Sequence, residues 1–183
     1  IYKKIILIVN DLGYSVVEKF ATMFPKQFYN AGVAEQNMMG LASGMALGGN
    51  HVFVYSIGNF PTFRCAEQIR NDIDYHKLPV TIVSVGCGVG YGNLGYTHHA
   101  LQDYSLMRSF PNMLILSPGN NNEVISCLKY IIKNPQPSYL RLDKDEIFND
   151  KKKRELYSAE FNGAISSNLK QKSSYRSYKK NEL

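Results

Sequence analysis

An alternation of short apolar segments with longer segments of helical composition constrains the fold of this chain more than any other feature. Several runs rich in Val, Ile and Leu are bounded by Gly, Pro or Asn, which is typical of strands buried on both faces. They cover residues 3–9, 51–57, 78–86, 113–118 and 138–142. Helices are expected between them, at residues 33–47, 62–76, 102–108 and 121–132. The alternation predicts an α/β fold with a parallel sheet flanked by helices on both faces, and ligands bound beyond the carboxyl ends of the strands.

The alternation ends near residue 143, and the composition changes there. Residues 144–163 are charged and irregular, and residues 164–183 are polar and rich in Ser, Lys and Tyr. We therefore predict one folded domain at residues 1–143, a linker at 144–163 and a disordered basic tail at 164–183. Residues 151–183 hold nine Lys or Arg and three Glu, which accounts for the whole net charge of +6. Residues 1–150 therefore carry 12 basic and 12 acidic groups, and because these charges balance we expect no nucleic-acid partner.

Membrane proteins and disulfide-rich or zinc-binding proteins are also disfavoured. No apolar run approaches the roughly 18 residues that a membrane span needs, and the first segment is too short for a signal peptide. We expect no membrane partner and a cytoplasmic location. The three cysteines, Cys65, Cys87 and Cys127, are far apart and form no CxxC pair. We expect buried, reduced thiols and no metal site in this chain.

A single acidic residue, Glu35, opens the predicted helix at residues 33–47, in a segment that is otherwise small, apolar or amide. An ionised carboxylate away from water is costly unless it is paired, so a buried Glu35 would be a candidate proton donor. A half-exposed Glu35 in the first turn would instead be stabilised by the helix dipole, and the residue types leave both alternatives open. Gly40, Gly44 and Gly48 recur along this apolar helix and indicate close packing, in a core or at a subunit interface.

The glycine-rich loop after the third predicted strand presents two adjacent histidines, His98 and His99. Neighbouring side chains point in different directions, so one of them is a candidate hydrogen-bond donor or proton shuttle. Arg141 leaves the last predicted strand at its carboxyl end, where a guanidinium can bind a phosphate through two parallel hydrogen bonds. A salt bridge from Arg141 to Asp143 or Asp145 is equally compatible with the sequence.

Several segments together resemble the pyrimidine-binding domain of transketolases, above all the separate C-terminal subunit of two-chain transketolases. They are, in chain order, NAGVAEQNMMGLASGMAL, FVYSI, RCAEQIRNDIDYHKLPV, GYTHHALQD, MRSFPNM and YLR. The combination of AEQN with THH and PN makes the resemblance specific, and it extends over about residues 10–142. It implies the thiamine diphosphate-binding fold, with a domain of the pyrimidine type.

The resemblance also implies thiamine diphosphate chemistry on sugar phosphates. Glu35 matches the family glutamate that hydrogen-bonds N1′ of the aminopyrimidine and moves a proton there, so that the thiazolium C2 can be deprotonated. A two-carbon ketol unit then passes from a ketose to an aldose, with the cofactor as electron sink. A carboxylate in an apolar site suits this role because it needs a strong hydrogen bond to a weakly basic nitrogen.

Other site residues follow from the same resemblance. Phe60 and Phe63 are candidates for the aromatic rings that stack on the pyrimidine, and Arg64 could face the substrate. His98 matches the histidine that contacts the substrate or the reacting carbon, and Arg141 matches the arginine that holds the sugar phosphate.

What the sequence lacks implies a partner. In this family the diphosphate and its divalent metal, Mg²⁺ or Ca²⁺, are held by another domain through a GDG motif, which does not occur here. The resemblance therefore implies a separate diphosphate-binding N-terminal subunit, in a homodimer of heterodimers, with residues 144–163 as a linker toward a third domain that is missing. Two alternatives stay open: an enzyme like deoxyxylulose-phosphate synthase, which joins pyruvate to an aldehyde phosphate, and a truncated remnant without catalytic activity.

Overall fold

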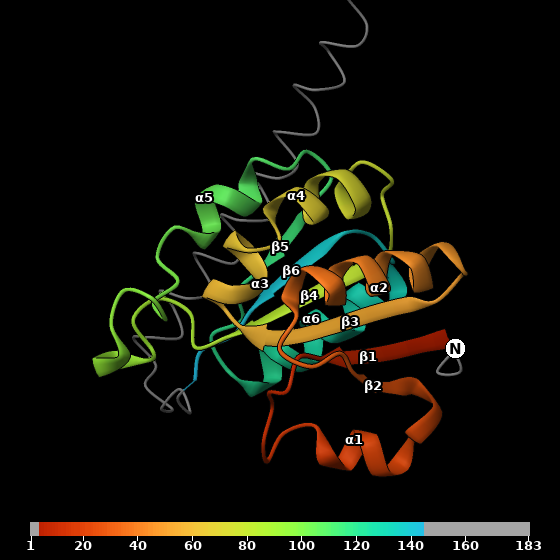
Figure 1. Cartoon of the computed structure of the whole chain (residues 1–183), viewed down its shortest axis with the longest axis horizontal. Coiled ribbons are helices and arrows are strands. Elements are labelled where there is room, and N and C mark those ends of the chain that lie inside the picture. The colour runs from red at the N-terminus through yellow and green to blue at the C-terminus, as the bar shows by residue number, and fades with distance from the viewer. Residues whose placement is uncertain (1–3, 145–183) are drawn as a thin grey trace, which may run out of the picture.

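A sheet of six strands, in the spatial order β2-β1-β3-β4-β6-β5, forms the centre of the molecule (Figure 1). The computed structural model describes residues 4–144, so the predicted linker and tail lie outside the described residues, apart from Lys144. The strands are β1 (Ile5–Val9), β2 (Phe28–Asn30), β3 (His51–Ile57), β4 (Val80–Val85), β5 (Leu114–Leu116) and β6 (Ser138–Arg141). Every neighbouring pair is parallel, which confirms the predicted sheet.

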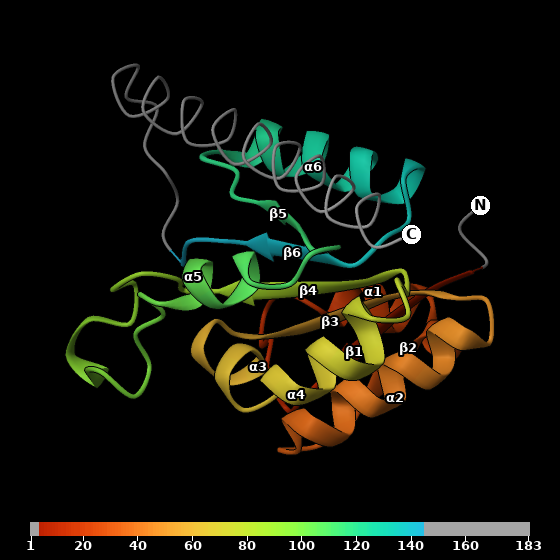
Figure 2. The same ribbon diagram turned by 90° about the horizontal axis from the view of Figure 1, so that it is seen from above.

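Helices cover both faces of this sheet, as predicted (Figure 2). One face carries α6, and the other carries α2, α3, α4 and α5, while α1 lies beyond β2 at the edge of the sheet. The helices are α1 (Glu18–Met23), α2 (Glu35–Leu47), α3 (Asn59–Phe63), α4 (Ala66–Gln68), α5 (Asp103–Arg108) and α6 (Asn121–Lys133). Shorter 3₁₀ or π segments are η2 (Pro25–Gln27), η3 (Ile69–Asp74) and η4 (Gly92–Leu94).

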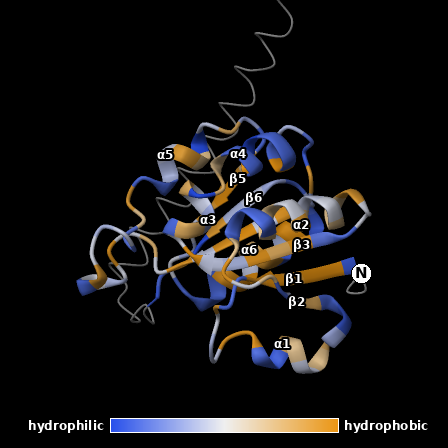
Figure 3. Cartoon of the chain, viewed as in Figure 1, coloured by the Kyte–Doolittle hydropathy of each residue, from blue (hydrophilic) through white to orange (hydrophobic). Residues whose placement is uncertain are grey.

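The two covered faces explain why the central strands are apolar at successive positions rather than at alternate ones. In Figure 3 these strands form an apolar band through the middle of the molecule. Val52 and Val54 of β3 belong to a buried cluster that includes Met38 of α2. Phe53, between them, points to the other face and belongs to a cluster that includes Ile131 of α6. Burial on both faces thus fixes the sheet between its two helical layers.

Three local features of the structure differ from what the sequence predicted. The strand β2 and the helix α1 were not expected, and the helix expected at residues 62–76 is divided into α3, α4 and η3. The division lies at Arg64 and Cys65, and Cys65 has φ −115° and ψ 14°, outside the helical range. This break lets the chain present Arg64 at the end of α3, next to the start of α2.

The close packing expected for the glycines of α2 does not occur in the core of this chain, among residues 4–144. Only one side of α2 packs on the sheet, and the opposite side, with Gly40 and Gly44, is exposed. A Cβ added at either glycine would meet no atom within 4 Å, and Leu41 is 36% exposed. The reason is geometric: α2 belongs to an outer layer, so its glycines approach no other backbone among residues 4–144. Close packing against another chain is the alternative that the structure leaves for this side.

The cysteines are free and buried, as expected. Burial raises the pKa of the Cys65 and Cys87 thiols to about 12 and that of Cys127 to about 11. Within the described range, no cluster of three or more His, Cys, Asp and Glu side chains is arranged to hold a metal ion. None of the described helices combines the length and the apolar character that a membrane crossing requires.

Candidate active site

The residues expected to form a site lie along the carboxyl edge of the sheet, where segments leave parallel strands side by side. The segments after β2, β3 and β4 and the end of β6 supply, in that order, Glu35, then Phe60, Phe63 and Arg64, then His98, and finally Arg141. The fold therefore brings together residues that are far apart in the sequence. Two groups of contacts result, one around Glu35 and one around Arg141.

Glu35 is the first residue of α2 and is buried, with 6% of its surface exposed. Its Oε1 accepts a hydrogen bond from Nη1 of Arg64 at 2.7 Å. A second link joins the same elements, because Nε2 of Gln36 donates to the Arg64 carbonyl at 2.9 Å. The alternative of a half-exposed Glu35 is thus excluded. The charge of the buried Glu35 carboxylate is compensated by the guanidinium of Arg64, whose side chain is 52% exposed. No residue between 4 and 144 donates a hydrogen bond to the other oxygen, Oε2.

The ring of Phe60 contacts both Arg64, which pairs with Glu35, and His98 of the glycine-rich loop. The guanidinium carbon of Arg64 lies 4.3 Å from the centroid of the Phe60 ring. On another side, the ring meets His98 edge-on, with centroids 5.3 Å apart. Phe63 behaves differently: it is 44% exposed, and within residues 4–144 its ring forms no aromatic or cation–π contact with the other predicted site residues. Of the two candidate aromatic rings, only Phe60 lies within the group.

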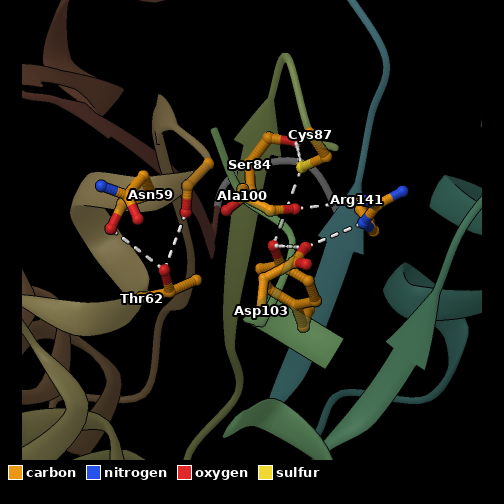
Figure 4. A network of polar contacts seen from close by, with 9 residues as sticks. Asn59, Thr62, Ser84, Cys87, Ala100, Asp103 and Arg141 are labelled. Atoms are coloured by element: carbon orange, nitrogen blue, oxygen red, sulfur yellow. Dashed lines mark hydrogen bonds and ion pairs between the residues drawn. The ribbon is translucent and has the colours of Figure 1, made fainter. Parts of the chain in front are cut away.

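The first turn of α3 holds Phe60 in place. The Thr62 hydroxyl donates to the carbonyls of Gly58 at 2.9 Å and Asn59 at 3.1 Å (Figure 4). Nδ2 of Asn59 donates to the Thr97 carbonyl at 2.7 Å, which ties this turn to the loop of the histidines. Hydrogen bonds from side chains to backbone carbonyls therefore fix the turn that carries Phe60 relative to that loop.

The two adjacent histidines have different surroundings, as the sequence predicted. His98 lies against Phe60 and forms a hydrogen bond through Nδ1 with Oγ1 of Thr97 at 3.0 Å. His99 turns back to its own loop, where Nε2 lies 2.8 Å from the Gly92 carbonyl oxygen. His98 is consequently the histidine that could contact a ligand bound beside Phe60.

Arg141 is held by Asp103, not by the aspartates that follow it in the sequence. Nε of Arg141 donates to Oδ2 of Asp103 at 2.8 Å, and the side chain of Asp103 is fully buried (Figure 4). Nη2 donates to the Ala100 carbonyl at 3.4 Å, and the guanidinium carbon lies 4.5 Å from the ring centroid of Tyr104. The alternative salt bridge to Asp143 is wrong, and Asp145 lies outside the described residues. The pairing with Asp103, 38 residues away, gave no local sequence signal.

A row of buried polar side chains crosses the sheet at the same edge and was not expected. Ser56 of β3 pairs with Ser84 of β4, and Ser84 pairs with Arg141 of β6. Asn10 directly follows β1, whose last residue is level with Tyr55, so Asn10 is level with Ser56. Among the described residues, the Asn10 amide and the Ser56 hydroxyl have no hydrogen-bond partner. Such buried groups are rare, so these atoms are available to a ligand or to ordered water. The signal was present in the sequence, where a polar residue ends or interrupts each apolar run at this level.

The edge thus combines a buried carboxylate, an aromatic ring with a histidine beside it, and a fixed guanidinium. The carboxylate can hold or exchange a proton with a ring nitrogen, and the aromatic ring can stack on a planar group. The guanidinium can bind an anionic group. This set suits a flat heterocycle bound beside Glu35 and Phe60 and a phosphate group bound at Arg141.

Comparison with known proteins agrees with these features. A family model described as "Transketolase, pyrimidine binding domain" matches residues 2–148. The chain is 37% identical over 144 residues to a putative transketolase C-terminal section of Methanocaldococcus jannaschii, a match that covers 78% of this chain and 46% of that protein. It is 36% identical over 143 residues, with the same coverage of each chain, to one subunit of an apulose-4-phosphate transketolase of Phocaeicola vulgatus.

A synthase and a solved structure are similar as well. A 1-deoxy-D-xylulose-5-phosphate synthase of Pelotomaculum thermopropionicum is 37% identical over 131 residues, which is 70% of this chain and 20% of that enzyme. A solved structure described as a split gene transketolase, an inactive beta4 tetramer, superposes with a TM-score of 0.70 at 34% identity. The match covers 79% of this chain and 46% of that one, so the chain spans about half the length of the transketolase chains it matches.

Proposed function

The chain belongs to the transketolase family through its pyrimidine-binding domain, and we propose that it provides the aminopyrimidine half of a thiamine diphosphate site. Membership of this family implies dependence on thiamine diphosphate. The proposed reaction is the transfer of a two-carbon ketol unit between sugar phosphates. The observation that supports this most directly is the buried carboxylate of Glu35 at the edge of the sheet, in a group of contacts with Arg64, Phe60 and His98.

The residues around Glu35 fit an aminopyrimidine. Glu35 keeps Oε2 without a hydrogen bond from residues 4–144, so that oxygen can meet a ring nitrogen such as N1′. Phe60 offers a half-buried ring at the same place, which suits stacking on the pyrimidine. Phe63, which is 44% exposed, is the weaker candidate for that role. When bound, thiamine diphosphate supplies a nucleophilic carbon and an electron sink, chemistry that no side chain of this site has.

In the proposed mechanism, the side chains of this chain hold, orient and exchange protons. Glu35 holds the pyrimidine through N1′ and exchanges a proton there, while Arg64 compensates the charge of the carboxylate until the ring is bound. His98, placed beside Phe60, contacts the hydroxyl or carbonyl oxygen of the sugar near the reacting carbon. Arg141 binds the sugar phosphate, and Arg64, with half of its side chain exposed, can also face the substrate.

The rest of the cofactor requires another polypeptide in this proposal. A diphosphate-binding N-terminal subunit would hold the diphosphate through Mg²⁺ or Ca²⁺, and two such pairs would form a homodimer of heterodimers. One finding supports a partner: the similar split gene transketolase, as a beta4 tetramer, is described as inactive. The exposed side of α2, with Gly40 and Gly44, is a surface where another chain could pack closely.

Reconstitution tests the proposal. The purified chain is mixed with a diphosphate-binding subunit, thiamine diphosphate and Mg²⁺, and ketol transfer from a ketose phosphate to an aldose phosphate is measured. We expect transfer that Glu35→Gln abolishes, because the amide cannot exchange the proton. Glu123→Gln is the matched control, since Glu123 also lies in the first turn of a helix but on the opposite face of the sheet. Unchanged turnover in Glu35→Gln would refute the role of Glu35.

The similarity to the synthase supports a second candidate reaction, in which pyruvate loses carbon dioxide and its two remaining carbons join an aldehyde phosphate. The same reconstituted sample separates the two reactions. Carbon dioxide released from pyruvate identifies the synthase, whereas transfer from a ketose phosphate without carbon dioxide identifies the transketolase. A truncated remnant would show neither reaction with any partner.

A further inference from the structure

The carboxylate of Asp103 lies behind Arg141 and is the only fully buried charged side chain at this edge among the described residues. We infer that Asp103 is a positioning residue, which fixes the guanidinium of Arg141 so that its terminal nitrogens select substrates with a phosphate group. This inference rests on the proposed function, in which Arg141 binds the sugar phosphate. It adds a residue that does not itself touch the substrate.

Two donors from one strand hold the Asp103 carboxylate. Oδ2 accepts hydrogen bonds from the Tyr139 hydroxyl at 2.8 Å and from Nε of Arg141 at 2.8 Å. Residues two apart in a strand point to the same face, so β6 presents both donors side by side. Burial keeps the pKa of Tyr139 well above its ordinary value, so its hydroxyl stays a donor. A carboxylate without exposure is stable only when its charge is paired, and here one oxygen receives both bonds.

The contacts around Arg141 fix the guanidinium in its plane. Asp103 occupies Nε, the Ala100 carbonyl accepts from Nη2, and the Tyr104 ring lies 4.5 Å from the guanidinium carbon. Ala100 is itself held, because it forms an antiparallel bridge with Gly88. The side chain of Arg141 has 21% of its surface exposed, so a ligand can reach it.

This arrangement leaves a defined pair of donors. A guanidinium has N–H groups on Nε, Nη1 and Nη2, and bidentate binding of a phosphate uses two that lie on one edge. The edge that includes Nε is taken by Asp103. The edge formed by Nη1 and Nη2 remains, because within the described residues Nη1 has no partner and Nη2 has one long bond of 3.4 Å. Asp103 therefore decides which edge of Arg141 a phosphate meets.

A purely structural role for Asp103 predicts something else. If Asp103 only compensates the charge of Arg141, its loss lowers the stability of the protein but affects phosphorylated and unphosphorylated sugars alike. If it positions Arg141, its loss weakens the binding of the phosphorylated sugar selectively. A misplacement of about 1 Å at a binding group can cost about 100-fold, so we expect a selective loss of roughly 10-fold to 100-fold.

The experiment uses the full chain reconstituted with the diphosphate-binding subunit, thiamine diphosphate and Mg²⁺. Wild type, Asp103→Asn and Tyr139→Phe are titrated by calorimetry with an aldose phosphate and with the same aldose lacking phosphate. The same samples give kcat and KM for both sugars as acceptors. We expect Asp103→Asn to raise the dissociation constant and KM of the phosphorylated sugar only, and Tyr139→Phe to do so by a smaller factor, because it keeps the ion pair.

Asp74→Asn is the matched control. Asp74 is also buried, with 3% exposure, and accepts a hydrogen bond from the Asn112 backbone at 3.0 Å, but it lies where the chain enters β4, at the opposite edge of the sheet. This variant should lose stability and keep the phosphate preference. Asp103 has 0% exposure, so the comparison involves two carboxyls that are both buried.

Each result decides the question. The inference is overturned if Asp103→Asn keeps the wild-type preference for the phosphorylated sugar, or if the wild type has no such preference. If the wild type binds the aldose phosphate preferentially but transfers no ketol unit, the proposed function is contradicted. In that case the dissociation constants of the phosphorylated and unphosphorylated aldose still decide the role of Asp103. If Asp103→Asn loses the preference for the phosphorylated sugar and Asp74→Asn keeps it, the inference that Asp103 positions Arg141 is supported.

Discussion

His51 should make the stability of this protein depend on pH in a predictable way. It is the first residue of β3, has 8% exposure and stacks on Phe53 with ring centroids 4.8 Å apart. Its Nε2 lies 3.2 Å from Oγ1 of Thr81. Burial lowers the pKa of His51 from 6.5 to about 4, because the surroundings disfavour the charged imidazolium. The folded protein therefore keeps a neutral imidazole where the unfolded chain would bind a proton.

The sign and size of the effect follow from that difference. Above about pH 6.5 the imidazole is neutral in both states, and its contribution to stability is complete. As the pH falls from 6.5 toward 4, only the unfolded state takes up the proton, so the free energy of unfolding decreases. The difference between the two pKa values corresponds to about 3 kcal/mol, most of which should be lost by about pH 4.5.

Urea unfolding followed by circular dichroism, at several pH values between 7.5 and 4.5, measures this loss. The comparison is with His51→Gln, which can keep a hydrogen bond to Thr81 but does not titrate. Carboxyl groups that titrate in the same range contribute equally to both proteins, so the difference between the two pH profiles isolates His51. Parallel profiles would refute the reasoning, because they would mean that the folded protein accommodates the charged ring.

Two further predictions concern α2. Arg64→Met should lower the free energy of unfolding, measured by urea titration, by about 1 to 2 kcal/mol, because it leaves the buried Glu35 carboxylate without its partner. The double variant with Glu35→Gln should recover part of this loss. No recovery would contradict the pairing of Arg64 with Glu35. Gly44→Ala should stabilise the free chain by about 0.5 to 1 kcal/mol, since the added methyl meets no atom within 4 Å. The same variant should weaken assembly with the diphosphate-binding subunit, measured by sedimentation, if the exposed side of α2 packs against it; undiminished assembly would count against that surface.

The sequence was most informative where burial on both faces dictates composition. The long apolar runs predicted five of the six strands, and only β2 and α1 were missed. The strand β2 has three residues, two of them exposed, so no hydrophobic pattern marks it, and its pairing with β1 is what defines it. The sequence could not decide whether the glycines of α2 pack in the core or at a subunit interface, because an apolar composition cannot tell an outer helix with an exposed side from a buried one.

Site residues could be predicted singly but not their partners. Glu35 and Arg141 were identified from their positions at element ends and from the family resemblance. Their ion pairs join residues 29 and 38 positions apart, and such pairs form only when helices pack onto the sheet. The closer aspartate in the sequence, Asp143, was the wrong choice for Arg141. The cytoplasmic location, the lack of a nucleic-acid partner and the boundaries at residues 143 and 163 stay predictions.

The place of β6 in the sheet has a consequence for how the protein is made. This last described strand lies between β4 and β5, and β6 is the only strand that pairs with β5 in the described sheet. During synthesis, β5 has no strand to join until residues 138–141 have left the ribosome, and the edge of β4 stays open for the same time. Open edges of parallel strands invite pairing with other chains. A nascent chain that stalls before residue 138 would therefore have a finished Glu35 region but an uncovered sheet edge, which makes it a target for chaperones or aggregation.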